Sequence, residues 1–183
     1  MVGMRSGLKI ILGMLGLAGL VAAQDSPGRR APSVSMVPAG ITAVTRGKAG
    51  TVDLTFRVAS GFHINSNTPK SEFLIPTNLK LTAPTDIVVG KITYPAGEDA
   101  TFPFAPDEKL SVYTGDFNLM VTIHALHSVI PGKYALHGQL KYQACDNAAC
   151  YPPKVLPVDF EVKVEKGKAP PRPNPPQSPH AHN

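Results

Sequence analysis

The chain has 183 residues, a formal net charge of +5 at neutral pH, and hydrophobic residues at 43% of its positions. This length and apolar content suffice for one domain with a buried core and exclude a wholly disordered chain. The excess of positive charge is small and no cluster of basic residues stands out, so the composition does not indicate nucleic-acid binding.

The N-terminus has the pattern of a secretory signal peptide. Arg5 and Lys9 accompany an apolar run over residues 10–21, which is long enough for a signal but shorter than the ~20 residues of a membrane span. Val21-Ala22-Ala23 predicts cleavage after Ala23, with an uncleaved anchor helix as the alternative. Cleavage leaves 160 residues (183 − 23) with 16 basic and 13 acidic side chains, a charge of +3. We therefore expect a periplasmic or secreted protein.

The ends of the mature chain differ in composition from its middle. Residues 24–33 are polar and are interpreted as a flexible lead-in. Residues 167–183 contain six prolines and no apolar run, which predicts a disordered or polyproline-type tail. The folded domain is expected over residues 34–166.

Within these limits, hydrophobic and polar residues alternate with a period of two, as in half-buried antiparallel strands. The longest such segments are 51–58, 117–125, 133–142 and 158–165. Shorter strands are expected at Ile41–Thr45, Leu79–Thr82, Ile87–Tyr94 and Ser111–Tyr113. Turn-forming residues separate these segments, and no segment has a sustained helical period. The pattern predicts an all-β fold, an immunoglobulin-like β-sandwich of seven to nine antiparallel strands, with an open barrel as the alternative.

The only two cysteines of the sequence, Cys145 and Cys150, flank an Asp-Asn-Ala-Ala loop that follows a long expected strand. In an exported chain we expect them to form a disulfide, with Cα atoms ~4.4–6.8 Å apart. Closing so short a loop stabilises the fold by only about 2 kcal/mol, which favours a working redox pair over a purely structural bridge. Asp146 disfavours a strongly activated thiolate, so the pair is expected to react with a docked partner.

Tyrosines on either side of the cysteines are candidates for sheltering the bridge. Tyr142 precedes Cys145 and Tyr151 follows Cys150. Tyr142 has the same strand parity as the apolar Leu136 and Leu140, so packing in the core is its alternative role.

The histidines do not indicate a metal site. His124 and His127 are an odd number of positions apart on an expected strand, which would place them on opposite faces. His63 is interpreted as structural, with a place near the redox site as the alternative. Copper binding by the cysteines, Met120 and histidines is a third functional option, but the spacing does not favour it. We predict no metal and no cofactor.

Two motifs together identify a family resemblance. One is Tyr142-Gln143-Ala144-Cys145 followed by Cys150-Tyr151-Pro152-Pro153, and the other is the segment Gly61–Asn67 followed by Leu74–Thr77. In these motifs, and in the strand pattern over residues 34–165, the chain resembles the N-terminal periplasmic domain of the DsbD thiol:disulfide interchange proteins.

The resemblance implies an immunoglobulin-like sandwich whose dithiol receives electrons from a membrane-embedded protein and passes them to periplasmic oxidoreductases of the thioredoxin fold. It also implies that Cys150 forms the mixed disulfide and that Cys145 resolves it. The family covers its cysteines with an aromatic cap loop. Here the candidate cap is Thr101–Pro106, with Phe102 or Phe104 as the shield. No membrane donor follows in this chain, so we expect a separate protein to supply electrons.

We therefore predict a periplasmic thiol-disulfide exchange domain, monomeric and without a cofactor, in which Cys145 and Cys150 carry the chemistry. A non-catalytic immunoglobulin-like binding module with a structural disulfide is the alternative. Whether the domain acts as an enzyme, a component of a protein-disulfide reductase, stays open at this point.

Overall fold

The computed structural model describes residues 34–167. The predicted signal peptide and lead-in, and all of the predicted tail except Gly167, lie outside the described residues. In residues 34–167 no helix is long and apolar enough to cross a membrane.

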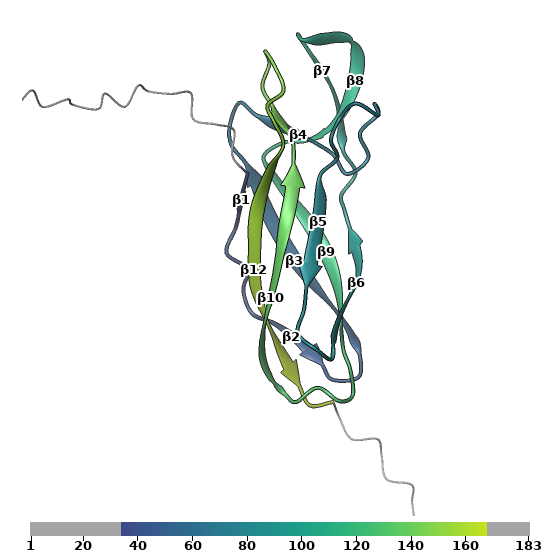
Figure 1. Cartoon of the computed structure of the whole chain (residues 1–183), viewed down its shortest axis with the longest axis vertical. Coiled ribbons are helices and arrows are strands. Elements are labelled where there is room, and N and C mark those ends of the chain that lie inside the picture. The colour runs from purple at the N-terminus through teal and green to yellow at the C-terminus, as the bar shows by residue number, and fades with distance from the viewer. Residues whose placement is uncertain (1–33, 168–183) are drawn as a thin grey trace, which may run out of the picture. The chain divides into compact units, whose positions relative to one another are not determined.

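The described residues form twelve strands and no helix (Figure 1). The strands are β1 (Val34–Met36), β2 (Thr42–Thr45), β3 (Ala49–Val58), β4 (His63–Asn65), β5 (Asn78–Thr82), β6 (Ile87–Thr93), β7 (Glu98–Phe102), β8 (Ala105–Tyr113), β9 (Asp116–Ala125), β10 (Gly132–Tyr142), β11 (Ala144–Cys145) and β12 (Lys154–Glu165).

Two four-stranded sheets make up the sandwich. One has the strand order β1-β3-β9-β6 and the other has the order β2-β12-β10-β5. Figure 1 shows β10 and β12 in front of β3 and β9. Every strand pair is antiparallel except β12 with β2, which run parallel from the pair Val162–Thr42 to the pair Glu165–Thr45. The predicted immunoglobulin-like β-sandwich is thus confirmed, with one parallel pair added.

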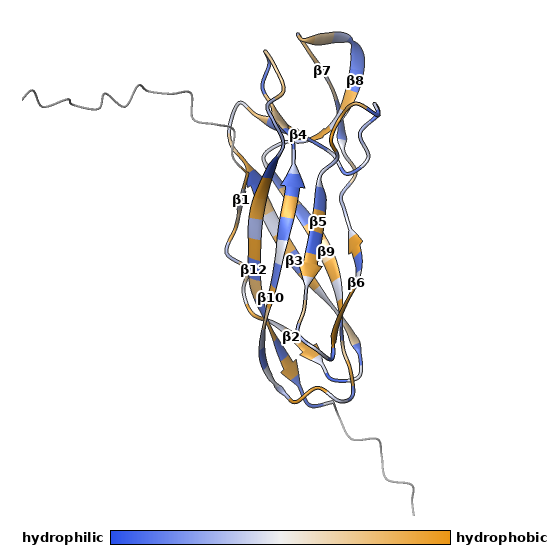
Figure 2. Ribbon diagram, viewed as in Figure 1, coloured by the Kyte–Doolittle hydropathy of each residue, from blue (hydrophilic) through white to orange (hydrophobic). Residues whose placement is uncertain are grey.

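The hydrophobic core lies between the two sheets because alternate residues of each strand face inwards. Figure 2 shows this alternation as orange and blue bands along the strands. The inward-facing side chains that are fully buried include Val52, Leu54, Phe56, Leu119, Val121, Ile123, Leu136, Leu140, Val158 and Val162. These residues come from four strands distant in sequence, so the core holds both sheets together.

A third sheet, in the order β11-β4-β8-β7, lies at one end of the sandwich (Figure 1). Its first strand, β11, continues from β10 after Gln143 alone. The long strand β10 therefore carries the chain out of the sandwich and directly into this terminal sheet.

The long strands end where predicted, and β9 and β10 also begin within one residue of the prediction, but β3 begins two residues early and β12 four residues early, at Lys154. Strands β2, β5 and β6 agree with the prediction to within one residue at each end. Strand β8 is longer than predicted, since it begins at Ala105 rather than at Ser111. The expected total of seven to nine strands was too low. The missed strands β1, β4 and β11 have two or three residues each, which is too few to show a period. The fourth missed strand, β7, has no buried residue and therefore no apolar face.

Candidate redox site

A short hairpin at the end of β10 carries both cysteines. Cys145 and Cys150 are opposed as an antiparallel bridge pair and form a disulfide with an Sγ–Sγ distance of 2.02 Å. Their Cα atoms are 3.9 Å apart, closer than the predicted range. The predicted range covers disulfides in general, whereas these residues lie directly opposite each other in a tight hairpin.

The two cysteines differ in exposure. Cys145 is 0% exposed, whereas Cys150 is partly exposed. Cys145 pairs with a strand of the terminal sheet, and Cys150 lies on the outer arm of the hairpin. Cys150 is therefore the more accessible of the two cysteines.

Asp146 organises the loop between the cysteines. Its Oδ1 accepts hydrogen bonds from the backbone N–H groups of Ala148 (2.8 Å) and Ala149 (2.9 Å). Its Oδ2 accepts a hydrogen bond of 2.7 Å from the Tyr151 hydroxyl. An aspartate that bonds the backbone two and three residues ahead is a common way to fix a tight turn, so the hairpin keeps its shape through more than the disulfide.

Gln143 links the cysteine hairpin to the rest of the site. Its Oε1 accepts hydrogen bonds from Asn65 Nδ2 (3.1 Å) and from the Ile75 backbone N–H (3.2 Å). Its Nε2 donates to the Tyr151 carbonyl at 3.3 Å. Sequence reasoning did not assign a role to Gln143 or Asn65. The signal that could have identified them is their place in the two motifs that carry the family resemblance. The hydrogen bonds of Gln143 bring these two motifs together in space.

His63 lies beside the disulfide. It is the register partner of Cys145 between β4 and β11 and is only 3% exposed. Burial lowers the pKa of its imidazole from 6.5 to about 4, and the charge of Asp146 opposes this shift. His63 thus has the place near the redox site that was the alternative to a structural role, and the sequence did not favour it because the pairing with Cys145 is not visible locally.

The rings of the predicted cap stack on His63. The Phe102 centroid is 3.7 Å from that of His63, with an interplanar angle of 10°. The Phe104 ring lies 5.7 Å from Phe102 and 6.3 Å from His63. The tip of the β7–β8 hairpin thus lies against the register partner of Cys145.

The two tyrosines occupy different places. Tyr151 is partly exposed, bonds to Asp146 and packs edge-on against Phe62 at 6.1 Å. Tyr142 is buried within the hydrophobic core, and its hydroxyl accepts a hydrogen bond of 3.3 Å from the Val34 backbone N–H. Tyr142 therefore has the core position that was its alternative, whereas Tyr151 belongs to the hairpin.

The two histidines considered as a metal pair do not lie on the same strand. His124 is exposed on β9, but His127 follows the end of β9 and faces Gly47, so the prediction that both lie on one strand was wrong. No group of three or more His, Cys, Asp or Glu side chains within residues 34–167 could hold a metal ion. The copper option has no ligand cluster to support it there.

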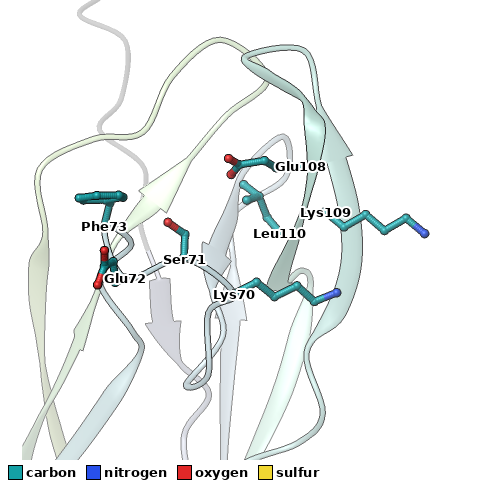
Figure 3. Close-up of a pocket in the computed structure, with 7 residues that line it drawn as sticks. All are labelled: Lys70, Ser71, Glu72, Phe73, Glu108, Lys109 and Leu110. Carbon is teal, nitrogen blue, oxygen red and sulfur yellow. The ribbon is translucent and has the colours of Figure 1, made fainter.

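A hollow of about 560 Å³ lies between residues 70–73 and residues 108–110 (Figure 3). Its lining combines the charged side chains of Lys70 and Glu108 with Phe73, which is 87% exposed. None of the predicted site residues lines this hollow, so it is separate from the disulfide.

Residues 34–161 match the family described as "Thiol:disulfide interchange protein DsbD, N-terminal". The chain belongs to this family. A similar solved structure is the reduced N-terminal domain of DsbD from Neisseria meningitidis, with 18% identity, coverage of 72% of this chain and 90% of that chain, and a TM-score of 0.41. Another is the complex between the DsbD and PilB N-terminal domains of the same organism, with 22% identity, coverage of 60% and 73%, and a TM-score of 0.39. No curated protein matches.

Membership of this family, together with the Cys145–Cys150 disulfide, fits thiol-disulfide exchange. The DsbD N-terminal domain is a periplasmic domain. The family, the fold class and the functional class predicted from the sequence are thereby confirmed.

Proposed function

We propose that this domain passes electrons to partner oxidoreductases through Cys145 and Cys150, and that Cys150 is the cysteine that forms the mixed disulfide. The observation that carries the assignment is the difference in exposure, with Cys145 fully buried and Cys150 partly exposed. A partner sulfur needs a direct approach to the sulfur that it bonds, because exchange proceeds through a mixed disulfide.

The reaction has two displacement steps. The Cys150 thiolate attacks one sulfur of the partner's disulfide, and the partner's other sulfur leaves with the electron pair of the broken bond. The Cys145 thiolate then attacks Cys150 Sγ, and the partner's first sulfur leaves as a thiolate. The products are the Cys145–Cys150 disulfide and a partner reduced by two electrons.

The partners are proposed from the family resemblance. Acceptors would be periplasmic oxidoreductases of the thioredoxin fold, and a separate membrane protein would reduce the Cys145–Cys150 disulfide. We further propose that the domain acts as a monomer over residues 34–166, and that it reaches the periplasm after cleavage of the signal peptide at Ala23.

The cap is proposed to be the tip of the β7–β8 hairpin. The support is the stack of Phe102 and Phe104 on His63, the residue opposite Cys145. Tyr151, tied to Asp146, would cover the opposite arm of the hairpin. Such apolar cover would limit reaction of the disulfide with small thiols until a partner docks.

The first experiment is to equilibrate the mature protein in glutathione buffers and determine the reduction potential of the pair. We expect a value of about −180 to −270 mV, the range of known exchange proteins. A value below about −300 mV is typical of structural bridges. It would favour the binding module with a static disulfide, an alternative that the complete burial of Cys145 also suits.

Single-cysteine variants test the two roles. With a thioredoxin-fold oxidoreductase as the probe, Cys145→Ser should accumulate a mixed disulfide, because the resolving sulfur is absent. Cys150→Ser should trap little or none, because its remaining sulfur is buried. Trapping by Cys150→Ser alone would reverse the assignment.

A further inference from the structure

His63 has a buried atom with no hydrogen-bond partner. Its Nε2 is inaccessible to solvent and has no hydrogen-bond partner among the described residues. The great majority of buried polar side-chain atoms are hydrogen-bonded, because an unpaired one costs about 1–3 kcal/mol. His63 lies beside a cysteine pair that alternates between a disulfide and two thiols. In the disulfide state neither sulfur carries a proton that could form a hydrogen bond to Nε2.

The register places this ring next to the buried sulfur. His63 and Cys145 are direct Cα partners on antiparallel strands. Residues in this relation have Cβ atoms about 4.5–5.5 Å apart and project to the same side of the sheet. The stack on Phe102 occupies one face of the imidazole, which restricts the ring to a narrow range of orientations.

The exchange reaction requires a proton acceptor at this place. Cys145 must lose its thiol proton before its sulfur can attack Cys150 Sγ, and burial disfavours a free thiolate. Cys145 is 0% exposed, so bulk water does not reach it to accept the proton directly.

We propose that His63 holds the proton of Cys145 during exchange, an inference that rests on the function proposed above. With its own proton on Nδ1, the imidazole offers Nε2 as an acceptor. Nε2 takes the Cys145 thiol proton as that sulfur bonds to Cys150 Sγ, and the partner sulfur leaves with the electron pair. In the reverse direction Cys145 leaves with the electron pair and recovers the proton from the imidazolium.

The surroundings of His63 favour an imidazole that is protonated only briefly during exchange and is otherwise neutral. The cysteine hairpin contributes the carboxylate of Asp146, whose charge favours the imidazolium. The β7–β8 hairpin contributes the rings of Phe102 and Phe104. Burial holds the pKa of His63 at about 4, so the imidazole is neutral and free to accept at neutral pH and readily gives the proton up again.

The test follows the reduced protein as it reacts with dithiobis(nitrobenzoate). Attack by Cys150 releases a first nitrothiobenzoate, and resolution by Cys145 releases a second in an intramolecular step. In the wild type we expect the rate of the second release to be nearly constant between about pH 6 and 8, because the base is already neutral. In His63→Phe the rate should rise about tenfold per pH unit and be about a hundredfold slower at pH 6.

His63→Phe keeps an aromatic ring against Phe102 and removes the unpaired nitrogen, so the fold should be retained. His63→Gln, which is polar but does not titrate, should show the same steep dependence on pH. His124→Gln is the matched control, since His124 is exposed on β9 away from the disulfide, and it should behave as the wild type. A flat profile in the folded His63→Phe protein would overturn the inference.

The test separates the two proposals. If the wild type releases two equivalents and the His63 variants keep its profile, exchange stands and only the role of His63 fails. If the wild type releases one equivalent, the pair does not resolve and both fail. A measurement on the wild type needs no variant: reduction of the disulfide should shift the ¹⁵N resonance of His63 Nε2. An unchanged resonance would contradict a hydrogen bond to the thiol.

Discussion

At the residue scale, the burial of His63 links its protonation to the stability of the fold. The pKa of its imidazole is about 4 in the folded domain against 6.5 for a free histidine, mainly because burial penalises the charged form. The unfolded chain therefore binds this proton more readily. The contribution to stability is complete above pH 6.5 and is lost as the pH falls towards 4.

We expect protonation of His63 to lower the free energy of unfolding of the oxidised domain by up to about 3 kcal/mol between pH 6.5 and 4. Urea unfolding of the wild type and of His63→Phe, at several pH values in this range, measures the effect. The other titratable groups contribute equally to the free energy of unfolding of both proteins. The stability of the variant relative to the wild type should therefore increase as the pH falls. A difference that is independent of pH would show that His63 titrates normally in the fold.

At the scale of the elements, strand β4 connects the cysteine hairpin to the cap hairpin. One edge of β4 pairs with β11 through His63 and Ile64. The other edge pairs with β8, through Ile64 to Tyr113 and Asn65 to Val112. The register between β7 and β8 shifts beyond Ala100, and the tip of this hairpin carries Phe102. The cap is thus anchored on the same strand that supports the disulfide.

Phe102→Ala should expose the disulfide to small reductants. An aromatic stack contributes about 0.5–1.5 kcal/mol beyond its buried area, so its loss should speed reduction by dithiothreitol about two- to tenfold. The matched control is Phe73→Ala, because Phe73 is highly exposed and lines a separate hollow. Equal rates for the two variants would argue against the β7–β8 hairpin as the cap.

At the scale of the whole described domain, the sandwich and the redox site are built from different sheets. The core lies between the sheets β1-β3-β9-β6 and β2-β12-β10-β5, whereas the disulfide lies on β11 in the terminal sheet. Substitutions in the core of the sandwich should therefore change stability without changing the redox chemistry.

Leu119→Ala should lower the free energy of unfolding by about 2–5 kcal/mol, since it removes a fully buried side chain from the core. Its neighbour Met120 is 46% exposed on the opposite face of β9, so Met120→Ala should change stability by no more than about 0.5 kcal/mol. Both variants should keep the wild-type reduction potential. A marked change of potential in Leu119→Ala would mean that the core and the site are coupled.

The sequence by itself determined the parts of this protein that depend on neighbours along the chain. Alternation of polar and apolar residues identifies β3, β9, β10 and β12, because each strand is long enough to show its period. The motif around Cys145 and Cys150 identifies the family and the disulfide for the same reason, since both cysteines lie on one hairpin.

Only the tertiary structure decided what surrounds the disulfide. His63 is 82 residues (145 − 63) before Cys145 and meets it through a strand of three residues, which carries no periodic signal. Tyr142 has the parity of a core residue, but its bond to Val34 requires that β1 first pair with β3. The unequal burial of the two cysteines also depends on β4 covering one side of the hairpin, a contact that forms between distant segments and leaves no trace in the local sequence.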